Sequence, residues 1–121
     1  MSTARIIKKY PNRRLYDTEE SRYITLADIK GLILAQTDLI VIDKKSGNDI
    51  TRSILLQVIS DQEQYGEAIM SEEFLAQIIR CYGKVSPANM ASHLEQSLRH
   101  FMAQSQNISD NDIVGTFFSS N

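Results

Sequence analysis

Residues 5–18 read RIIKKYPNRRLYDT and set the beginning of the fold. Residues 5–10 suit an extended backbone, Pro11-Asn12 supplies a turn, and residues 14–17 can return as a short strand. The segment therefore predicts a basic hairpin or ribbon. Five basic residues and no acidic residue lie within residues 1–16, namely Arg5, Lys8, Lys9, Arg13 and Arg14.

The rest of the chain predicts further strands and then mostly helices. Residues 22–25 read as another short strand, and the apolar run 39–43 as a strand that is buried on both faces or central in a small sheet. Helical spacing of apolar residues predicts four helices, over about 26–36, 52–65 and 72–82 and from Pro87 onward. This order predicts an α+β fold, in which a short N-terminal ribbon or small sheet packs on a helical body.

The distribution of charge favours nucleic acid as a partner. The whole chain has a formal net charge of −2, but residues 1–30 hold seven basic and four acidic residues and the other 91 hold six and eleven. Phosphates would therefore meet the N-terminal end and be repelled by the rest. The side chains that suit phosphates, base edges or sugars are Lys8, Lys9, Tyr10, Asn12, Arg13 and Arg14, with Arg5, Arg22 and Arg52 as second-rank candidates.

Two alternatives stay open for this segment. Lysine and arginine also protect an exposed edge strand against pairing with other chains, without any ligand. Tyr16, and with it Tyr10, can equally pack beneath the hairpin as a core residue.

The chain offers little for catalysis or metal binding. His93 and His100 lie about 10 Å apart along one predicted helix, and Cys81 is the only cysteine. We expect no enzyme activity, no catalytic residues, no metal and no cofactor. No apolar run is long enough to span a bilayer, so we also expect a cytoplasmic protein without membrane contact.

The last helix predicts self-association. It is amphipathic and long for the core available, so we expect a homo-oligomer, a dimer or a tetramer. The candidate contacts with another copy or with an apolar polymer are Met90, Leu94, Leu98, Phe101 and Met102. The expected organisation is a DNA-binding α+β domain over 1–83, an oligomerisation helix over 84–103 and a flexible tail over 104–121, which contains Val114, Phe117 and Phe118.

Several strings resemble a known family. KKYPNRRLYDT at 8–18, SRYITL at 21–26, ITRSILLQ at 50–57 and the residues around 74–83 are similar to the N-terminal domain of the bacterial polyhydroxyalkanoate (polyhydroxybutyrate) synthesis repressors. The resemblance spans about residues 5–83. It implies a transcriptional repressor that binds double-stranded DNA at promoters of phasin and of its own gene.

The same resemblance implies a second partner, a polyhydroxyalkanoate granule or oligomer that removes the repressor from its operator. Family members carry a further region after the N-terminal domain, and residues 84–121 show no recognisable copy of it. The alternative function is an interaction module that binds protein or polymer without direct DNA contact, in which the basic segment protects an edge strand or docks an acidic partner.

Overall fold

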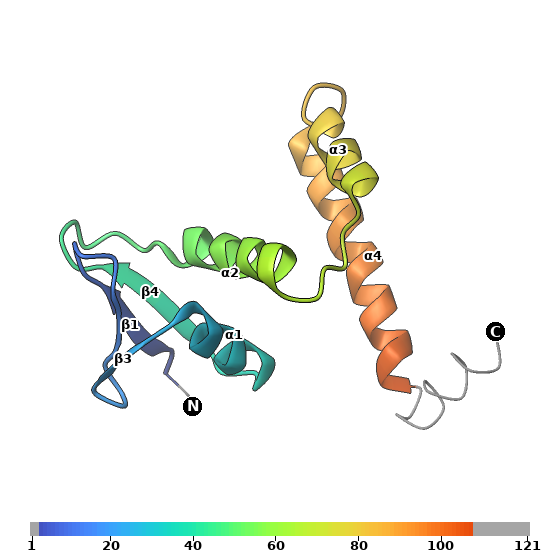
Figure 1. Ribbon diagram of the computed structural model, residues 1–121. Coiled ribbons are helices and arrows are strands. Elements are labelled where there is room, and N and C mark those ends of the chain that lie inside the picture. Colours follow the sequence, from blue (N-terminus) through green and yellow to red (C-terminus); the bar gives the residue numbers. More distant parts are fainter. Residues whose placement is uncertain (1–2, 108–121) are drawn as a thin grey trace. The chain divides into compact units, whose positions relative to one another are not determined.

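The computed structural model describes residues 3–107, which fall into an N-terminal unit that ends at Met70 and a C-terminal unit that begins at Ser71. A four-stranded sheet and two helices form the first unit, and two helices form the second (Figure 1), so the α+β prediction is confirmed. The elements are β1 (Arg5–Lys9), β2 (Leu15–Asp17), β3 (Arg22–Ile24), α1 (Leu26–Leu34), β4 (Leu39–Asp43), α2 (Thr51–Tyr65), α3 (Glu72–Cys81) and α4 (Pro87–Asn107).

The sheet combines an antiparallel meander with one parallel strand. Its order is β3-β2-β1-β4. β1 and β2 form the predicted hairpin, with Lys8 opposite Tyr16, whereas β4 runs parallel to β1, with Lys9 paired with Asp43. Because parallel strands end on the same side of a sheet, the segments that follow β1 and β4 leave the sheet side by side.

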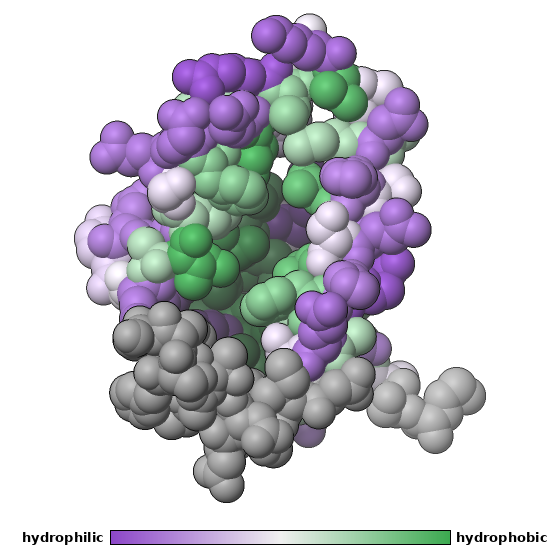
Figure 2. Space-filling model, turned by 90° about the vertical axis from the view of Figure 1, so that its right-hand side faces the viewer, coloured by the Kyte–Doolittle hydropathy of each residue, from purple (hydrophilic) through white to green (hydrophobic). Residues whose placement is uncertain are grey.

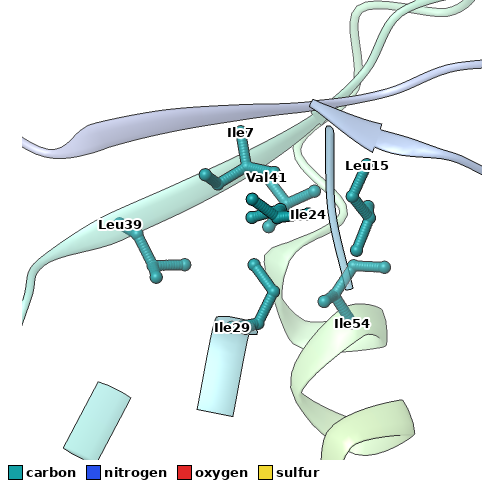
Figure 3. Close-up of a cluster of buried hydrophobic side chains, with 7 residues drawn as sticks. All are labelled: Ile7, Leu15, Ile24, Ile29, Leu39, Val41 and Ile54. Atoms are coloured by element: carbon teal, nitrogen blue, oxygen red, sulfur yellow. The ribbon is translucent and has the colours of Figure 1, made fainter. Parts of the chain in front are cut away.

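The core lies between the sheet and the two helices of the N-terminal unit (Figure 3). Alternate strand residues point into it, so each strand buries one face. Thr25 caps α1 in a capping box with Asp28, which fixes the start of this helix. The buried side chains are Ile7, Leu15, Ile24, Leu39 and Val41 from the strands, Ile29 from α1 and Ile54 from α2.

The position of β4 differs from the sequence prediction. It is an edge strand, and only Leu39 and Val41 are buried, while Ile40 and Ile42 on the other face are half-buried. The edge is protected by the chain that follows it. The Val41 N–H donates to Thr51 Oγ1, and the Ile50 N–H donates to the Val41 carbonyl, each over 2.8 Å. These hydrogen bonds explain how an apolar strand occupies an edge without exposing all its backbone groups.

The C-terminal unit consists of α3 and α4 and buries none of its described side chains fully. Ser71 caps α3 as expected, and α4 begins at Pro87. Residues 72–81, expected within the DNA-binding domain, lie in this unit. α4 continues to Asn107, so residues 104–107 of the expected tail are helical, and Val114, Phe117 and Phe118 lie outside the described residues.

Within residues 3–107, no helix has the length and apolar character needed to cross a membrane.

Candidate nucleic-acid interface

The hairpin loop, residues 10–14, is closed by its own hydrogen bonds. The Tyr10 N–H donates to the Arg14 carbonyl over 2.9 Å, and the Arg13 N–H donates to the Tyr10 carbonyl over 2.8 Å. Asn12 Oδ1 accepts from the Arg14 N–H over 3.1 Å, in the manner of an Asx turn. The Asn12 oxygen therefore holds the loop, while its amide nitrogen has no partner among the described residues.

Arg13 adopts an unusual backbone conformation. Its φ is 69°, in the left-handed region, where glycine or asparagine is the usual residue of a three-residue hairpin loop. A non-glycine residue there costs on the order of 1 kcal/mol. Ser21 and Gln36 also have positive φ values, so the conformation supports Arg13 as a functional candidate only together with its exposed place in the hairpin loop.

Most of the predicted DNA-contacting cations remain available. Five of these cations form no ion pair within residues 3–107, although Lys9 lies near the Asp43 carboxylate. The five are Lys8, Lys9, Arg13, Arg14 and Arg52.

Arg5 is in a different situation, because it holds the hairpin together. Its Nη2 lies 2.9 Å from Asp17 Oδ2 and 3.0 Å from Glu20 Oε2. Its side chain is only 13% exposed, and that of Asp17 is 2% exposed. Burial opposes ionisation of Asp17, but hydrogen bonds from Arg5 and from the backbone N–H groups of Glu19 and Glu20 prevail and hold its pKa below the usual range. The Arg5 guanidinium, which the sequence predicts as a second-rank DNA contact, is therefore bound to acidic side chains of the protein itself.

Arg22 is also paired, but at the surface. Its Nε lies 2.8 Å from Glu20 Oε1, and its Nη1 lies 4.0 Å from Asp28 Oδ2. Half of its side chain is exposed.

Three tyrosines form a cluster beside the hairpin loop. The rings of Tyr10, Tyr16 and Tyr23 meet edge to face, with centroids 5.3–6.1 Å apart. The Arg14 guanidinium stacks on Tyr23, 4.0 Å from the ring centroid. Tyr16 pairs with Lys8, whereas Leu15, which faces the core, pairs with Lys9. This tyrosine cluster therefore lies outside the main core, where it stiffens the hairpin and orients Arg14.

The cations occupy both faces of the sheet at the hairpin end. Lys8 shares the face of the tyrosine cluster. Lys9 and Arg13 border a cavity of about 500 Å³ on the helix side, whose apolar wall is Leu15, Leu26 and Ile54. Arg13 also borders a second cavity, of about 360 Å³, together with Arg14. Arg13 therefore lines both cavities.

The sequence reasoning missed two further lysines at this end of the sheet. Lys44 and Lys45 follow β4, and the Lys44 N–H donates to the Lys9 carbonyl over 2.8 Å. Two lysines directly after the apolar run 39–43 were a visible signal. Their place beside the hairpin depends on the parallel pairing of β1 with β4, which no local pattern reveals.

The proposed contacts of the last helix lie along α4. Met90 is half-buried, and Leu94, Leu98, Phe101 and Met102 are exposed. On α3 the side chains of Phe74, Leu75 and Ile79 are exposed, and so is Tyr82, which follows the helix. Figure 2 shows apolar residues, in green, that are uncovered between hydrophilic ones. Among the described residues, no group of three His, Cys, Asp or Glu side chains is placed to hold a metal ion.

Comparison of the sequence with known proteins shows its family. Residues 6–66 match the sequence model of the PHB/PHA accumulation regulator DNA-binding domain. The chain belongs to the PHB/PHA accumulation regulator family. This confirms the resemblance seen in the sequence. Residues 70–108 match the PHB accumulation regulatory domain of these regulators. The expectation that the chain lacks a copy of the family's second region is therefore wrong, because that region begins at residue 70, ahead of α3.

Two similar proteins extend the comparison. An uncharacterized protein in the phbA 5' region of Thiocystis violacea is 53% identical over 108 residues, which cover 89% of this chain and 78% of the relative. An uncharacterized protein of Allochromatium vinosum is 51% identical over 108 residues, 89% of this chain and 71% of the relative. No solved structure matches this regulator.

The two family regions coincide with the two units. The hairpin, the tyrosine cluster and the β4–α2 connection all lie in the DNA-binding domain, and α3 and α4 make up nearly all of the regulatory domain. In this PHB/PHA accumulation regulator, the cationic surface and the exposed apolar helices thus belong to different functional regions.

Proposed function

We propose that this protein is a transcriptional repressor of polyhydroxyalkanoate and phasin synthesis genes, which binds operators in double-stranded DNA through the hairpin of β1 and β2. The observation that supports this most is the group of four cations on a closed, aromatic-backed hairpin within the family's DNA-binding domain. Two-stranded ribbons of this kind fit the major groove of DNA.

Each side chain of the hairpin has a proposed role. Lys8, Lys9 and Arg14 neutralise phosphates, Tyr10 packs on sugar or phosphate, and Arg13 reaches a base edge from the tip of the loop. Asn12 contributes through its amide nitrogen, since its oxygen holds the loop. Arg52 and Arg22 are contacts of second rank. We propose that Arg5 acts indirectly, by holding β1, β2 and the segment after them in register.

The experiment that tests this function is a salt titration of DNA binding. The full chain is mixed with labelled promoter DNA of its own gene or of a phasin gene, and with a scrambled duplex of the same composition. The three cations assigned to phosphates, Lys8, Lys9 and Arg14, predict a slope of log K against log salt of about −2.7 for each bound chain, and tighter binding to the promoter. A chain that binds neither duplex at low salt would overturn the proposal.

The C-terminal unit is proposed to associate with further copies of the chain. Two helices that bury no described side chain fully cannot form a stable core by themselves, so their apolar faces need a covering surface. Packing between copies, as a dimer or tetramer, would supply it and would present two or more hairpins to one operator.

This association yields a prediction for α4. Replacing both Leu94 and Leu98 with aspartate is expected to shift the sedimenting species toward the monomer mass of 13.7 kDa, because it places charge in the apolar face. The matched control is Gln96→Asp, an exposed position on the opposite side of the same helix. Sedimentation velocity distinguishes them. A double variant that sediments like the original chain would remove α4 from the interface.

A second candidate function rests on the same exposed helices. The side chains of α3 and α4 that are proposed to meet another copy also suit an apolar polymer such as a polyhydroxyalkanoate granule or oligomer. Titration of the DNA complex with hydroxybutyrate oligomers tests whether these side chains bind polymer as well as another copy. Release of DNA supports polymer binding, and an unchanged complex argues against it.

A further inference from the structure

We propose that the β4–α2 loop, residues 44–50, is a second DNA-contacting segment, in which Lys44 and Lys45 bind backbone phosphates beside the hairpin loop. The inference rests on the proposed DNA-binding function and adds a separate surface to it. The hairpin would then be one of two neighbouring contacts that the sheet presents to the duplex.

The first argument is the position of the loop. β1 and β4 are adjacent and parallel, so the hairpin loop and the β4–α2 loop emerge from the same end of the sheet, at a strand spacing of about 4.8 Å. The 2.8 Å hydrogen bond from the Lys44 N–H to the Lys9 carbonyl joins the two chains where the loops begin. Figure 1 shows both connections at one end of β1 and β4.

The second argument is that the loop is already ordered. The Ser46 N–H and Oγ–H both donate to Asp43 Oδ2, over 3.1 Å and 2.7 Å. The Gly47 N–H donates to the Asp43 carbonyl over 2.7 Å, and Gly47 has a φ of 78°, which favours glycine. Because this turn is fixed in the free protein, binding would cost little further ordering of the loop backbone.

The third argument is charge. Residues 9–14 and 43–49 together hold five basic residues and two acidic ones, Asp43 and Asp49. Both carboxylates accept hydrogen bonds from neighbouring hydroxyl groups, Asp43 from Ser46 and Asp49 from Thr51. Lys44 and Lys45 are exposed and form no ion pair with any residue of the 3–107 range, although Lys45, like Lys9, lies near the Asp43 carboxylate. The end of the sheet therefore carries a net positive field, which attracts a phosphate backbone.

Lysine and arginine suit different DNA contacts, so the two loops have different proposed roles. A lysine ammonium is a compact point charge that suits phosphate, whereas the planar fork of Arg13 suits a base edge. Phosphate contacts position a protein on DNA but carry no sequence information. Lys44 and Lys45 should therefore strengthen binding to every duplex, and the hairpin loop should supply the preference for the operator.

The test is the full chain with Lys44→Ala and Lys45→Ala, titrated with salt on promoter and scrambled DNA. Removal of two phosphate-binding ammonium groups should make the salt slope shallower by about 1.8, and should weaken both duplexes by the same factor. The charge-matched control is Lys84→Ala with Arg99→Ala, two exposed cations of the C-terminal unit, and it should leave the slope nearly unchanged. Lys44→Arg with Lys45→Arg keeps the charge and should retain the original slope.

Three outcomes would overturn the inference. Unchanged slope and affinity in the alanine variant, with circular dichroism showing an intact fold, would assign Lys44 and Lys45 to protection of the β4 edge. A loss confined to promoter DNA would make them base contacts. If the unaltered chain binds no DNA, the proposed function itself is overturned. If the unaltered chain binds DNA and the alanine variant binds equally well, only the loop assignment fails.

Discussion

Replacing Asp17 with asparagine is expected to lower the free energy of unfolding of the N-terminal unit by about 3 kcal/mol, the lower end of the cost of breaking a buried ion pair. Asp17 is almost completely buried and accepts from Arg5 Nε over 3.1 Å and from the Glu19 N–H over 2.9 Å. In the variant, one carboxylate oxygen becomes an NH₂ group, which would face either the guanidinium or the backbone N–H groups.

Thermal and denaturant unfolding measure this change. For a unit of this size, the loss corresponds to a decrease in Tm on the order of 15 °C. The matched control is Asp61→Asn on the exposed surface of α2, where the same chemical change should cost less than about 0.5 kcal/mol. Equal stability of the two variants would show that the pair with Arg5 does not hold the hairpin.

The same carboxylate gives stability a pH dependence of known sign. The pKa of Asp17 is lower in the folded chain than in the unfolded chain, so its contribution is complete above the unfolded pKa and is lost as the pH falls through the folded value. The unfolding free energy should therefore fall as the pH drops below about 4. Because the asparagine side chain of the D17N variant cannot titrate, the gap in stability between the original chain and this variant should narrow in this range.

Local features of the fold were predictable from the sequence. Thr25, Ser71 and Pro87 mark helix starts, and Gly66 follows the end of α2, because capping and backbone preferences act over a few residues. The hairpin was predictable for the same reason, since Pro11-Asn12 forms a turn between two strands that pair with each other.

Features that depend on contacts between distant residues were not predictable. The pair of Arg5 with Asp17 spans twelve residues, and from charge alone Arg5 looks like any other DNA-binding cation. The edge position of β4 and its parallel partner set where Lys44 and Lys45 lie, and an apolar run specifies burial without specifying register. The candidate site was therefore found by composition, while its extent required the sheet topology.

Removing both guanidinium groups of the hairpin loop, with Arg13→Ala and Arg14→Ala, is expected to abolish retention of promoter DNA in a gel-shift assay. For each phosphate that is no longer neutralised, the salt slope should also become shallower by about 0.9. The charge-matched control is Arg80→Ala with Arg99→Ala in the C-terminal unit, which should preserve retention at moderate salt. If the hairpin variant binds promoter DNA like the original chain while its circular dichroism is unchanged, the hairpin is not the contact surface.

Two substitutions of Arg13 distinguish its effect on stability from its proposed role in DNA recognition. Arg13→Gly and Arg13→Ala both remove the guanidinium, so both should lose promoter preference to the same extent, roughly 10- to 100-fold for one bidentate base contact. Their stabilities should differ, because glycine adopts a φ of 69° without strain and alanine does not. The glycine variant should therefore melt at or above the temperature of the original chain, and the alanine variant below the glycine variant. This pattern would mean that the arginine is kept at a place where it costs stability because DNA recognition requires it, whereas retained promoter preference in both variants would show that Arg13 reads no base.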